Sequence, residues 1–173
     1  EVEEVCERGA HLLLSAPTGL GKTAGVLHGA LVAAYRSNRR VYFATARTTQ
    51  QRMVEETVRQ IASAGLPIKA VSIRARDKAC LNEVVACRPD CCRYAHGHHD
   101  KVRSEGLYDA LWAEAAGVIR VPSPDEVSVE SAAAVVCPFA LSMELTREAD
   151  VVIGDYNYAF DASRRISAMS DAP

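Results

Sequence analysis

Near its amino end the sequence reads His11-Leu-Leu-Leu-Ser-Ala-Pro-Thr-Gly-Leu-Gly-Lys-Thr23, an apolar run followed by a turn with two glycines. Residues 11–15 have the apolar character of a short buried strand. From Lys22 to about Arg36, leucine and alanine recur at helical spacing, which predicts a helix. A strand, a glycine-rich turn and a helix in this order form the context that a phosphate-binding loop requires.

The turn itself has the chemistry of a loop that holds nucleotide phosphates. Gly19 and Gly21 let the backbone turn sharply and bring its N–H groups toward phosphate oxygens, and the helix N-terminus adds a partial positive charge. Lys22 is suited to reach the β- and γ-phosphates of ATP and the Thr23 hydroxyl to ligate Mg²⁺, so both are candidate catalytic residues. The predicted nucleotide contacts are Ala16, Pro17, Thr18, Gly19, Leu20, Gly21, Lys22 and Thr23. The alternative is an unrelated glycine-rich turn between a strand and a helix.

The segments that follow predict an α/β fold with a mostly parallel sheet. Apolar runs at 41–44, 68–73 and 151–153 predict strands. A helix is predicted from Thr48 to about Ala64, and Gly65 follows it at a typical helix end. Strands that alternate with helices at this spacing need crossover connections, which favour a parallel sheet of the P-loop NTPase type.

The strand at 151–153 runs into Asp155, which invites a second Mg²⁺ assignment. An acidic residue at the end of an apolar strand can organise the metal of a nucleotide site. Tyr156 follows Asp155, where a second carboxylate would strengthen that interpretation. We therefore favour a structural role for Asp155 at the strand end.

The pattern changes near Arg74. Residues 74–138 hold clustered cysteines and histidines and show no strong apolar periodicity, so we expect an insertion without an easy core of its own. Within it we expect one helix near Gly106 to Ala116, followed by a polar stretch with Pro122 and Pro124. The predicted division is a P-loop part at 1–73, an insertion at 74–138 and a return to the first part at 139–173.

Composition restricts the function classes. Of 173 residues, 49% are hydrophobic and 24% charged, which is ordinary for a globular protein. No apolar run approaches the roughly 18 residues of a membrane span, and the acidic start (Glu1, Glu3, Glu4) does not resemble a signal peptide. We therefore expect a cytoplasmic protein with no membrane partner. The net charge of −2 implies that any nucleic-acid contact is local.

Four cysteines follow the spacing Cys80-x₆-Cys87-x₄-Cys92-x₄₄-Cys137. Structural zinc sites favour short Cys-x₂₋₄-Cys pairs, whereas a cubane iron–sulfur cluster accepts thiolates from separated places, so the spacing favours a cluster over zinc. One of the adjacent cysteines 91 and 92 is expected to be spare, and Cys6 is expected to be an ordinary small side chain. The histidines His96, His98 and His99 could ligate zinc, but a solvated polar loop is the favoured interpretation.

These motifs together resemble the XPD/DinG-like superfamily 2 iron–sulfur DNA helicases, most closely their bacterial DinG-like members. The phosphate loop is shared by many families. More specific are Cys80-Leu-Asn-Glu83 and Cys137-Pro-Phe-Ala-Leu-Ser142, and the match continues through Ala149-Asp-Val-Val-Ile-Gly-Asp-Tyr-Asn-Tyr158. The resemblance covers nearly the whole chain and implies a RecA-like motor domain that carries an iron–sulfur insertion.

In that family four cysteines bind a [4Fe–4S] cluster. By residue match these are Cys80, Cys87, Cys92 and Cys137. Cys92 is preferred over Cys91 because the family's third cysteine has a tyrosine two positions on, here Tyr94. The family usually has proline at position 93, so Arg93 and the additional cysteine at 91 are departures that leave the third ligand open.

The segment Thr45-Ala-Arg-Thr-Thr-Gln50 resembles the family motif that touches the DNA backbone. The resemblance implies DNA contacts from Thr45, Arg47, Thr48 and Gln50, which position a strand without reading its sequence. A structural alternative is a helix start capped by Thr48 or Thr49. Both interpretations can hold together.

The family also needs an Asp-Glu-Ala-His motif and a second motor domain, which these 173 residues do not contain. The chain therefore resembles part of a longer ATP-dependent DNA helicase, with 5′ to 3′ movement on single-stranded DNA or DNA junctions implied by resemblance. Its expected cofactors are ATP, Mg²⁺ and the cluster, and we expect a monomer in the bacterial cytoplasm, at the nucleoid when bound to DNA. The alternative is a nucleotide-binding P-loop protein with a structural zinc insertion and no nucleic-acid role.

Overall fold

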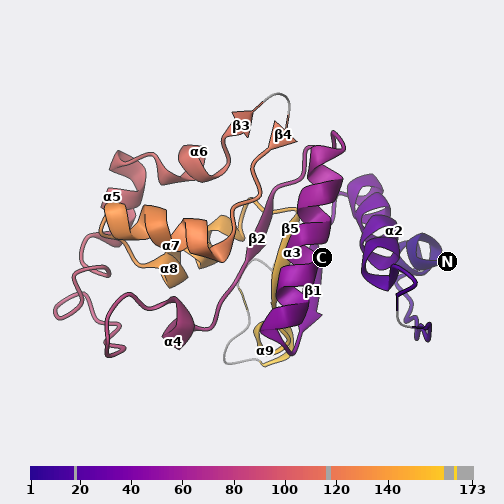
Figure 1. Ribbon diagram of the computed structural model, residues 1–173, viewed down its shortest axis with the longest axis horizontal. Helices are drawn as coiled ribbons and strands as arrows, with labels where there is room; N and C mark the ends of the chain where they lie inside the picture. The colour runs from indigo at the N-terminus through magenta and orange to yellow at the C-terminus, as the bar shows by residue number, and fades with distance from the viewer. Residues whose placement is uncertain (18, 116–117, 162–165, 167–173) are drawn as a thin grey trace.

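A three-stranded parallel sheet lies at the centre of the computed structural model (Figure 1). Its order is β1-β5-β2, with β1 at Val41–Thr45, β5 at Val151–Asp155 and β2 at Ala70–Ser72. The register pairs residue 151 with both 41 and 70. The structure describes residues 1–17, 19–115, 118–161 and 166. The predicted α/β class with a parallel sheet is confirmed.

The apolar run of β5 explains its central position. Val151, Val152 and Ile153 are all at most 4% exposed, as expected of a parallel strand that is covered on both faces. Successive side chains alternate between the faces, so residues 151 and 153 belong to one core cluster and residue 152 to the other. The sheet is therefore the middle layer between two sets of helices.

One face of the sheet is covered by α3, Thr48–Ser63, with α2, Lys22–Ser37, beside it. The core cluster on this face contains Val54 and Val58 of α3 and Leu27 of α2, all at most 2% exposed. Both helices follow the predicted bounds closely. Gly65 has a φ of 96°, a left-handed conformation that glycine adopts without strain, so the predicted helix end is confirmed.

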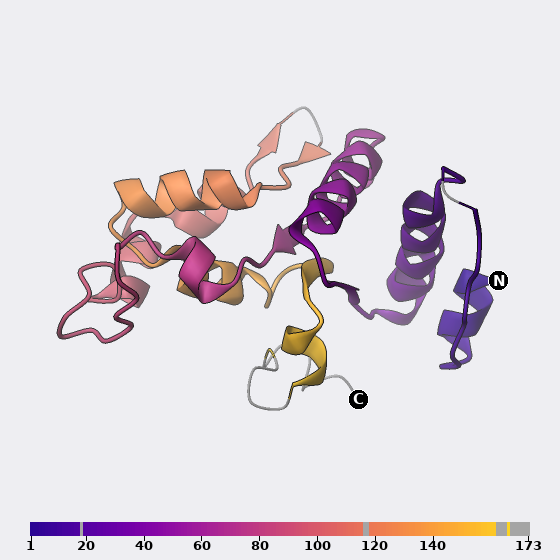
Figure 2. The same ribbon diagram turned by 60° about the horizontal axis from the view of Figure 1, so that its bottom comes forward.

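The predicted strand at residues 11–15 is wrong. The segment has no strand assignment, and Leu13 is 99% exposed. A strand is stable only when a neighbour takes up its backbone hydrogen bonds, and none of the described strands pairs with this segment. The chain enters instead through α1, Val2–Glu7, which lies on the side of α2 away from the sheet (Figure 2). Gly29 permits this approach, since an added Cβ would lie only 2.8 Å from the Val2 Cβ.

Short elements, most of them within residues 74–138, follow β2; most of the helices among them cover the other face of the sheet, whereas a two-stranded hairpin contacts α3. In chain order they are α4 Arg76–Ala79, α5 His98–Ser104, α6 Leu107–Leu111, β3 Glu114–Ala115, β4 Val118–Ile119, α7 Pro124–Ala133 and α8 Pro138–Leu145. A last short helix, α9 at Asn157–Phe160, follows β5. None of the described helices has the length and hydropathy to cross a membrane.

Residues 74–138 share a hydrophobic core with the sheet rather than forming one of their own. Thirteen buried residues form a cluster in which Val102, Leu107 and Val127 of the insertion join Leu141 of α8 and Val152 of the sheet. The apolar residues come from several short helices, so no single segment is long enough to show periodicity. The insertion is therefore packed onto the sheet by an ordinary hydrophobic core.

The single helix expected near 106–116 is shorter than predicted. The helix α6 ends at Leu111, and a two-stranded antiparallel hairpin, β3–β4, follows. The Arg120 N–H donates to the Ala113 carbonyl at 3.1 Å, which closes the base of this hairpin. The Ala113 carbonyl thus accepts a hydrogen bond from the hairpin rather than from a next helical turn.

The polar stretch predicted around Pro122 and Pro124 contains α7, which sequence analysis missed. Ser123 and Glu126 form a capping box: the Ser123 Oγ accepts the Glu126 N–H at 3.2 Å, and the Ser123 N–H donates to the Glu126 carboxylate at 2.7 Å. Pro124 occupies the first helical position, where its missing N–H costs nothing. The sequence Ser-Pro-Asp-Glu was a detectable signal for this helix start.

Substitution Ser123→Ala should lower the free energy of unfolding by about 1 kcal/mol, because the N–H of Glu126 loses its acceptor. Denaturant unfolding followed by circular dichroism measures the change. Ser63→Ala, at an exposed position in the last turn of α3, is the matched control and should change stability by less than about 0.5 kcal/mol. Equal effects of the two substitutions would contradict the capping role.

Candidate functional site

The predicted phosphate loop sits at the start of α2. Gly19 and Gly21 have φ values of 84° and 74°, the left-handed conformation that the tight turn needs. The Lys22 ammonium donates to the carbonyls of Ala16 at 3.0 Å and Pro17 at 2.6 Å, so it lies against the turn rather than in solvent. Its position at the N-terminus of a 16-residue helix adds the helix dipole to its own charge.

The other predicted nucleotide contacts surround this lysine in sequence. Leu20 is 70% exposed and Thr23 is half-buried in the first turn of α2. Thr18 lies outside the described residues. The exposed turn and its basic side chain retain the chemistry of a phosphate site, although the strand that was expected before the turn is absent from residues 11–15.

The predicted DNA-contact residues lie at the carboxyl edge of the sheet, where β1 ends and α3 begins. Thr45 is the last residue of β1 and is 6% exposed, and its Oγ1 has no hydrogen-bond partner among the described residues. Arg47, Thr48 and Gln50 are exposed. In open parallel sheets ligands bind outside the carboxyl ends of the strands, so this edge suits a ligand.

The alternative in which Thr48 or Thr49 caps α3 is wrong. The N-cap is Arg47, which has an extended backbone, and its carbonyl accepts from Gln50 N–H at 3.0 Å and Gln51 N–H at 3.1 Å. Both threonines are therefore already inside the helix. Because no side-chain cap bond forms there, their hydroxyls are not committed to capping.

Asp155 has the structural role that was favoured for it. Its Oδ1 accepts the backbone N–H of Asn157 at 2.9 Å, which organises the turn from β5 into α9. The Tyr42 hydroxyl donates to the Asp155 carbonyl at 2.8 Å from the adjacent strand. The residue is thereby tied to the end of the sheet.

Two of the predicted cluster cysteines affect the thiol of a third. Burial raises the pKa of the Cys137 thiol, Cys87 and Cys92 raise it further, and the backbone N–H groups of Ala140 and Phe139 oppose this. Cys87 and Cys92 therefore lie in the surroundings of Cys137, although 50 positions separate the first from the last. Among the described residues, the one group of ligand atoms within 4.8 Å of one another contains no cysteine.

The surroundings of Cys92 favour a thiolate. Cys92 is 7% exposed, and the Asn82 side-chain amide donates to its sulfur at 3.3 Å. Burial alone would raise the pKa of Cys92, but this amide and the backbone N–H groups of Ala95 and Tyr94 lower it overall. Donors directed at sulfur are typical of iron–sulfur ligands.

The remaining cysteines differ from Cys92. Cys80 is half-buried at the end of α4, only two residues before the Asn82 that contacts the Cys92 sulfur. Cys91 is exposed, and its sulfur faces the Arg88 carbonyl at 3.7 Å. Cys6 is exposed on α1, far from the others in sequence. Of the four predicted cluster ligands, Cys92 is buried, Cys80 and Cys137 are half-buried, and Cys87 is as exposed as the spare Cys91. Burial and the Asn82 amide therefore favour Cys92 over Cys91 as the third ligand.

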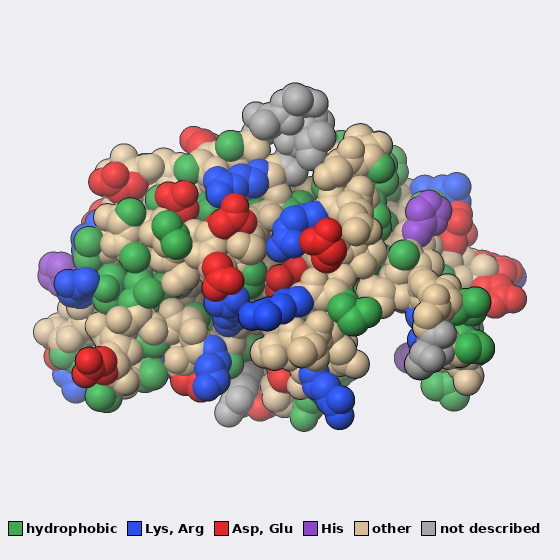
Figure 3. All heavy atoms as spheres, in the orientation of Figure 1, with side chains coloured by type: hydrophobic (Ala, Val, Ile, Leu, Met, Phe, Trp, Pro, Cys, Tyr) green, Lys and Arg blue, Asp and Glu red, His purple; other side chains and the backbone are tan. Residues whose placement is uncertain are grey.

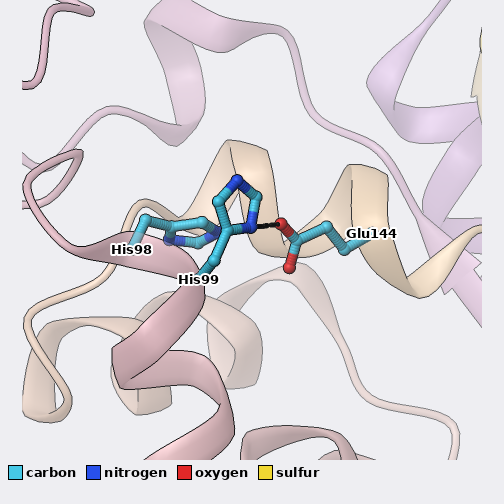
Figure 4. A group of neighbouring side chains, drawn as sticks. All are labelled: His98, His99 and Glu144. Atoms are coloured by element: carbon cyan, nitrogen blue, oxygen red, sulfur yellow. Dashed lines mark ion pairs between the residues drawn. The ribbon is translucent and has the colours of Figure 1, made fainter.

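The expectation of a solvated histidine loop is wrong for His98, which is 6% exposed at the start of α5. The imidazole Nε2 lies 3.4 Å from the Glu144 carboxylate, while the exposed His99 places its Nδ1 2.7 Å from the same oxygen (Figure 4). The Tyr108 hydroxyl donates to the other Glu144 oxygen at 2.7 Å. Three helices, α5, α6 and α8, thus meet at one carboxylate.

This buried carboxylate is held as an anion. Burial by itself would raise the pKa of Glu144, but the interactions with His98, Tyr108 and His99 outweigh it and lower the pKa to about 2. Burial and then the bond to Glu144 raise the pKa of Tyr108 to about 12, so its hydroxyl remains a donor at neutral pH. Sequence analysis missed both Tyr108 and Glu144, because 36 positions separate them and neither lies in a short motif.

The ligand atoms of His98, His99 and Glu144 lie within 4.8 Å of one another, a spacing that could hold a metal ion. The protonation of His98 opposes this. Its Nδ1 accepts the backbone N–H of Cys137 at 3.2 Å, and a neutral imidazole has only one free nitrogen lone pair. The Nε2 therefore carries the proton and faces the carboxylate, so we interpret the group as a polar network.

The surface charge is mixed. Figure 3 shows basic and acidic side chains side by side on one face rather than a single basic patch. The ion pairs of the structure include Arg74–Asp125, Lys69–Glu148 and Arg120–Glu126. This agrees with the net charge of −2 and with nucleic-acid contacts that are local.

Comparison with known families gives one result. A family model described as DEAD_2 matches residues 43–171, well over half of the 173 residues. The match includes the sheet, the cysteine-containing insertion and the edge where β1 ends, and it begins after the phosphate loop. No curated protein matches the chain.

Proposed function

Because the chain belongs to the DEAD_2 family and carries a helicase-family domain, we propose that it is part of an ATP-dependent DNA helicase with a [4Fe–4S] cluster. Membership in the helicase family implies ATP and Mg²⁺ as cofactors and an ATP-hydrolysing enzyme. The finer features are our inference: a DinG-like enzyme that couples hydrolysis to 5′ to 3′ movement along single-stranded DNA. We place it in the bacterial cytoplasm, at the nucleoid when bound to DNA.

The family match over residues 43–171 supports the proposal, and the influence of Cys87 and Cys92 on the pKa of Cys137 supports the cluster within that domain. Figure 1 shows α2, which begins at the phosphate loop, and the loop between α4 and α5, which holds Cys87 and Cys92, at opposite ends of the long axis. One end would bind ATP and the other the cluster. The sheet between them is the rigid connection.

The residues that would hold the cluster are Cys80, Cys87, Cys92 and Cys137, with Asn82 donating to one sulfur. When bound, the cluster would supply cross-links among thiolates from separate segments. The protein would supply the hydrophobic core that joins the insertion to the sheet. By resemblance, the insertion at 74–138 would act as a wedge or guide for the separated strand.

DNA would lie along the carboxyl edge of the sheet. Arg47, Thr48 and Gln50 are exposed there, and the unpartnered hydroxyl of Thr45 is adjacent in sequence. Hydroxyl, amide and guanidinium groups bind phosphate and sugar and position a strand without reading bases. Such contacts suit an enzyme that moves along any sequence.

The proposal is tested by anaerobic purification of the full-length protein, followed by iron, sulfide and unwinding measurements. We expect a brown protein with four iron and four sulfide per chain in a [4Fe–4S] cluster, and ATP-dependent unwinding of a duplex with a 5′ single-stranded tail. A colourless protein with stoichiometric zinc would instead support the nucleotide-binding protein with a zinc insertion. A protein that contains the iron but does not unwind DNA would support the cluster and overturn the proposed unwinding activity.

The 173 residues alone should show negligible DNA-stimulated ATP turnover. We propose that an acidic Asp-Glu-Ala-His motif and a second motor domain complete the site in a longer chain, and neither occurs here. Phosphate release with and without single-stranded DNA measures this. Robust turnover that depends on Lys22 would show that a carboxylate of this segment, such as Asp155, suffices.

A further inference from the structure

His98 links the two ends of α8. Its Nδ1 accepts the backbone N–H of Cys137, the N-cap of this helix, at 3.2 Å. Its Nε2 lies 3.4 Å from the carboxylate of Glu144, in the last turn of the same helix. Glu144 is in turn held by Tyr108 from α6 and His99 from α5. The imidazole is almost fully buried, so water cannot replace these contacts.

We propose that His98 is a positioning residue for Cys137. The imidazole accepts the backbone N–H of Cys137, so this N–H is not directed at sulfur. The same bond fixes the direction of the Cys137 thiol. The inference rests on the proposed cluster, because it concerns how this chain presents one cluster ligand. His98 touches no cluster sulfur itself. The bond at Nδ1 leaves the proton on Nε2, which faces the Glu144 carboxylate at 3.4 Å without a hydrogen bond.

The backbone at Cys137 explains why an acceptor is needed there. Pro138 follows and has no N–H, so the donors near the sulfur are those of Cys137, Phe139 and Ala140. The last two interact with the Cys137 sulfur, whereas the first is committed to His98. Hydrogen bonds to ligand sulfur raise the reduction potential of an iron–sulfur cluster. By accepting the Cys137 N–H, His98 would therefore affect both the position of the Cys137 ligand and the reduction potential of the cluster.

A matched pair of substitutions separates positioning from packing. His98→Asn places an amide oxygen close to the position of Nδ1 and keeps an acceptor for the Cys137 N–H. His98→Gln places its amide nearer the position of Nε2, so it keeps the contact with Glu144 and loses that acceptor. Both side chains are polar and smaller than histidine. His98→Leu keeps apolar volume and loses both contacts.

A chelator should remove the cluster roughly 10- to 100-fold faster from His98→Gln and His98→Leu than from the wild type. The decay of visible absorbance in anaerobic protein measures the rate of this loss. His98→Asn should stay close to wild type. The reduction potential, from a titration monitored by electron paramagnetic resonance, should shift in the positive direction in His98→Gln and His98→Leu, since the freed N–H can turn toward sulfur. It should be unchanged in His98→Asn.

The outcomes distinguish the two proposals. Wild-type protein that contains no iron overturns the cluster, and with it the premise of this inference. If the wild-type protein contains the cluster, two outcomes overturn only the positioning role of His98. In the first, all three variants behave alike; in the second, His98→Asn loses the cluster as fast as His98→Gln does. Rescue by asparagine alone supports it.

Discussion

Substitution Lys22→Ala should reduce ATP hydrolysis by the full-length protein on the order of 100- to 1,000-fold, the effect of removing one preorganised donor to transition-state charge. Lys22 begins α2, and its ammonium lies against the turn carbonyls of Ala16 and Pro17. ATP phosphates are far stronger partners for an ammonium group than neutral carbonyls are, so nucleotide binding should draw the side chain outward. DNA-stimulated phosphate release measures the loss.

The fold should survive this change. Lys22 is only half-buried and belongs to neither core cluster, so the thermal unfolding temperature should stay near that of wild type. Lys69→Ala is the matched control, because it removes the same charge from an ion pair with Glu148, 3.0 Å away, and should leave hydrolysis unchanged. Wild-type hydrolysis by Lys22→Ala would refute the assignment of the phosphate loop.

Substitution Cys137→Ser should abolish the cluster in anaerobic protein, and Cys80→Ser, Cys87→Ser and Cys92→Ser should do the same. A serine hydroxyl is a poor replacement for a thiolate toward iron. Iron and sulfide analysis of each variant measures the loss. Residues 74–138 should then become more sensitive to protease, since Cys137 connects α8 to the loop that contains Cys87 and Cys92.

The controls are Cys91→Ser and Cys6→Ser, which should retain the cluster. Cys91 and Cys92 are neighbours in sequence but differ in environment: Cys91 is exposed, whereas Cys92 is buried beside the Asn82 amide. Full cluster content in Cys92→Ser together with loss in Cys91→Ser would move the third ligand by one residue. Stoichiometric zinc without iron in the wild type would overturn the cluster.

Protease sensitivity should increase without complete unfolding of the insertion. The core around Val102, Val127 and Leu141 remains when the cluster is lost, and burying such side chains contributes roughly 1.5–3 kcal/mol each. We therefore expect cleavage first in the loop between α4 and α5, which has little regular structure. Uniform degradation of the whole insertion would show that the cluster, rather than the core, holds it together.

Elements with local evidence could be predicted directly from the amino-acid sequence. The helices α2 and α3 and the strand β5 follow directly from periodicity and continuous apolar runs, because each of them buries one long face or both faces. The evidence for the proposed phosphate loop is equally local, since its glycines, lysine and threonine lie within eight residues. The capping box of α7 was present in the sequence as well and was overlooked.

Contacts between segments that are distant in the sequence could not be predicted in this way and required the folded chain. The apolar residues 11–15 have the composition of a strand, yet no described strand pairs with them and Leu13 remains exposed. The polar His98 is buried beside two groups from distant positions: the Cys137 N–H, 39 positions away, donates to its Nδ1, and the Glu144 carboxylate, 46 positions away, faces its Nε2 at 3.4 Å without a hydrogen bond. Periodicity reports the burial of a single element, whereas strand pairing and buried polar contacts depend on partners supplied by the rest of the chain.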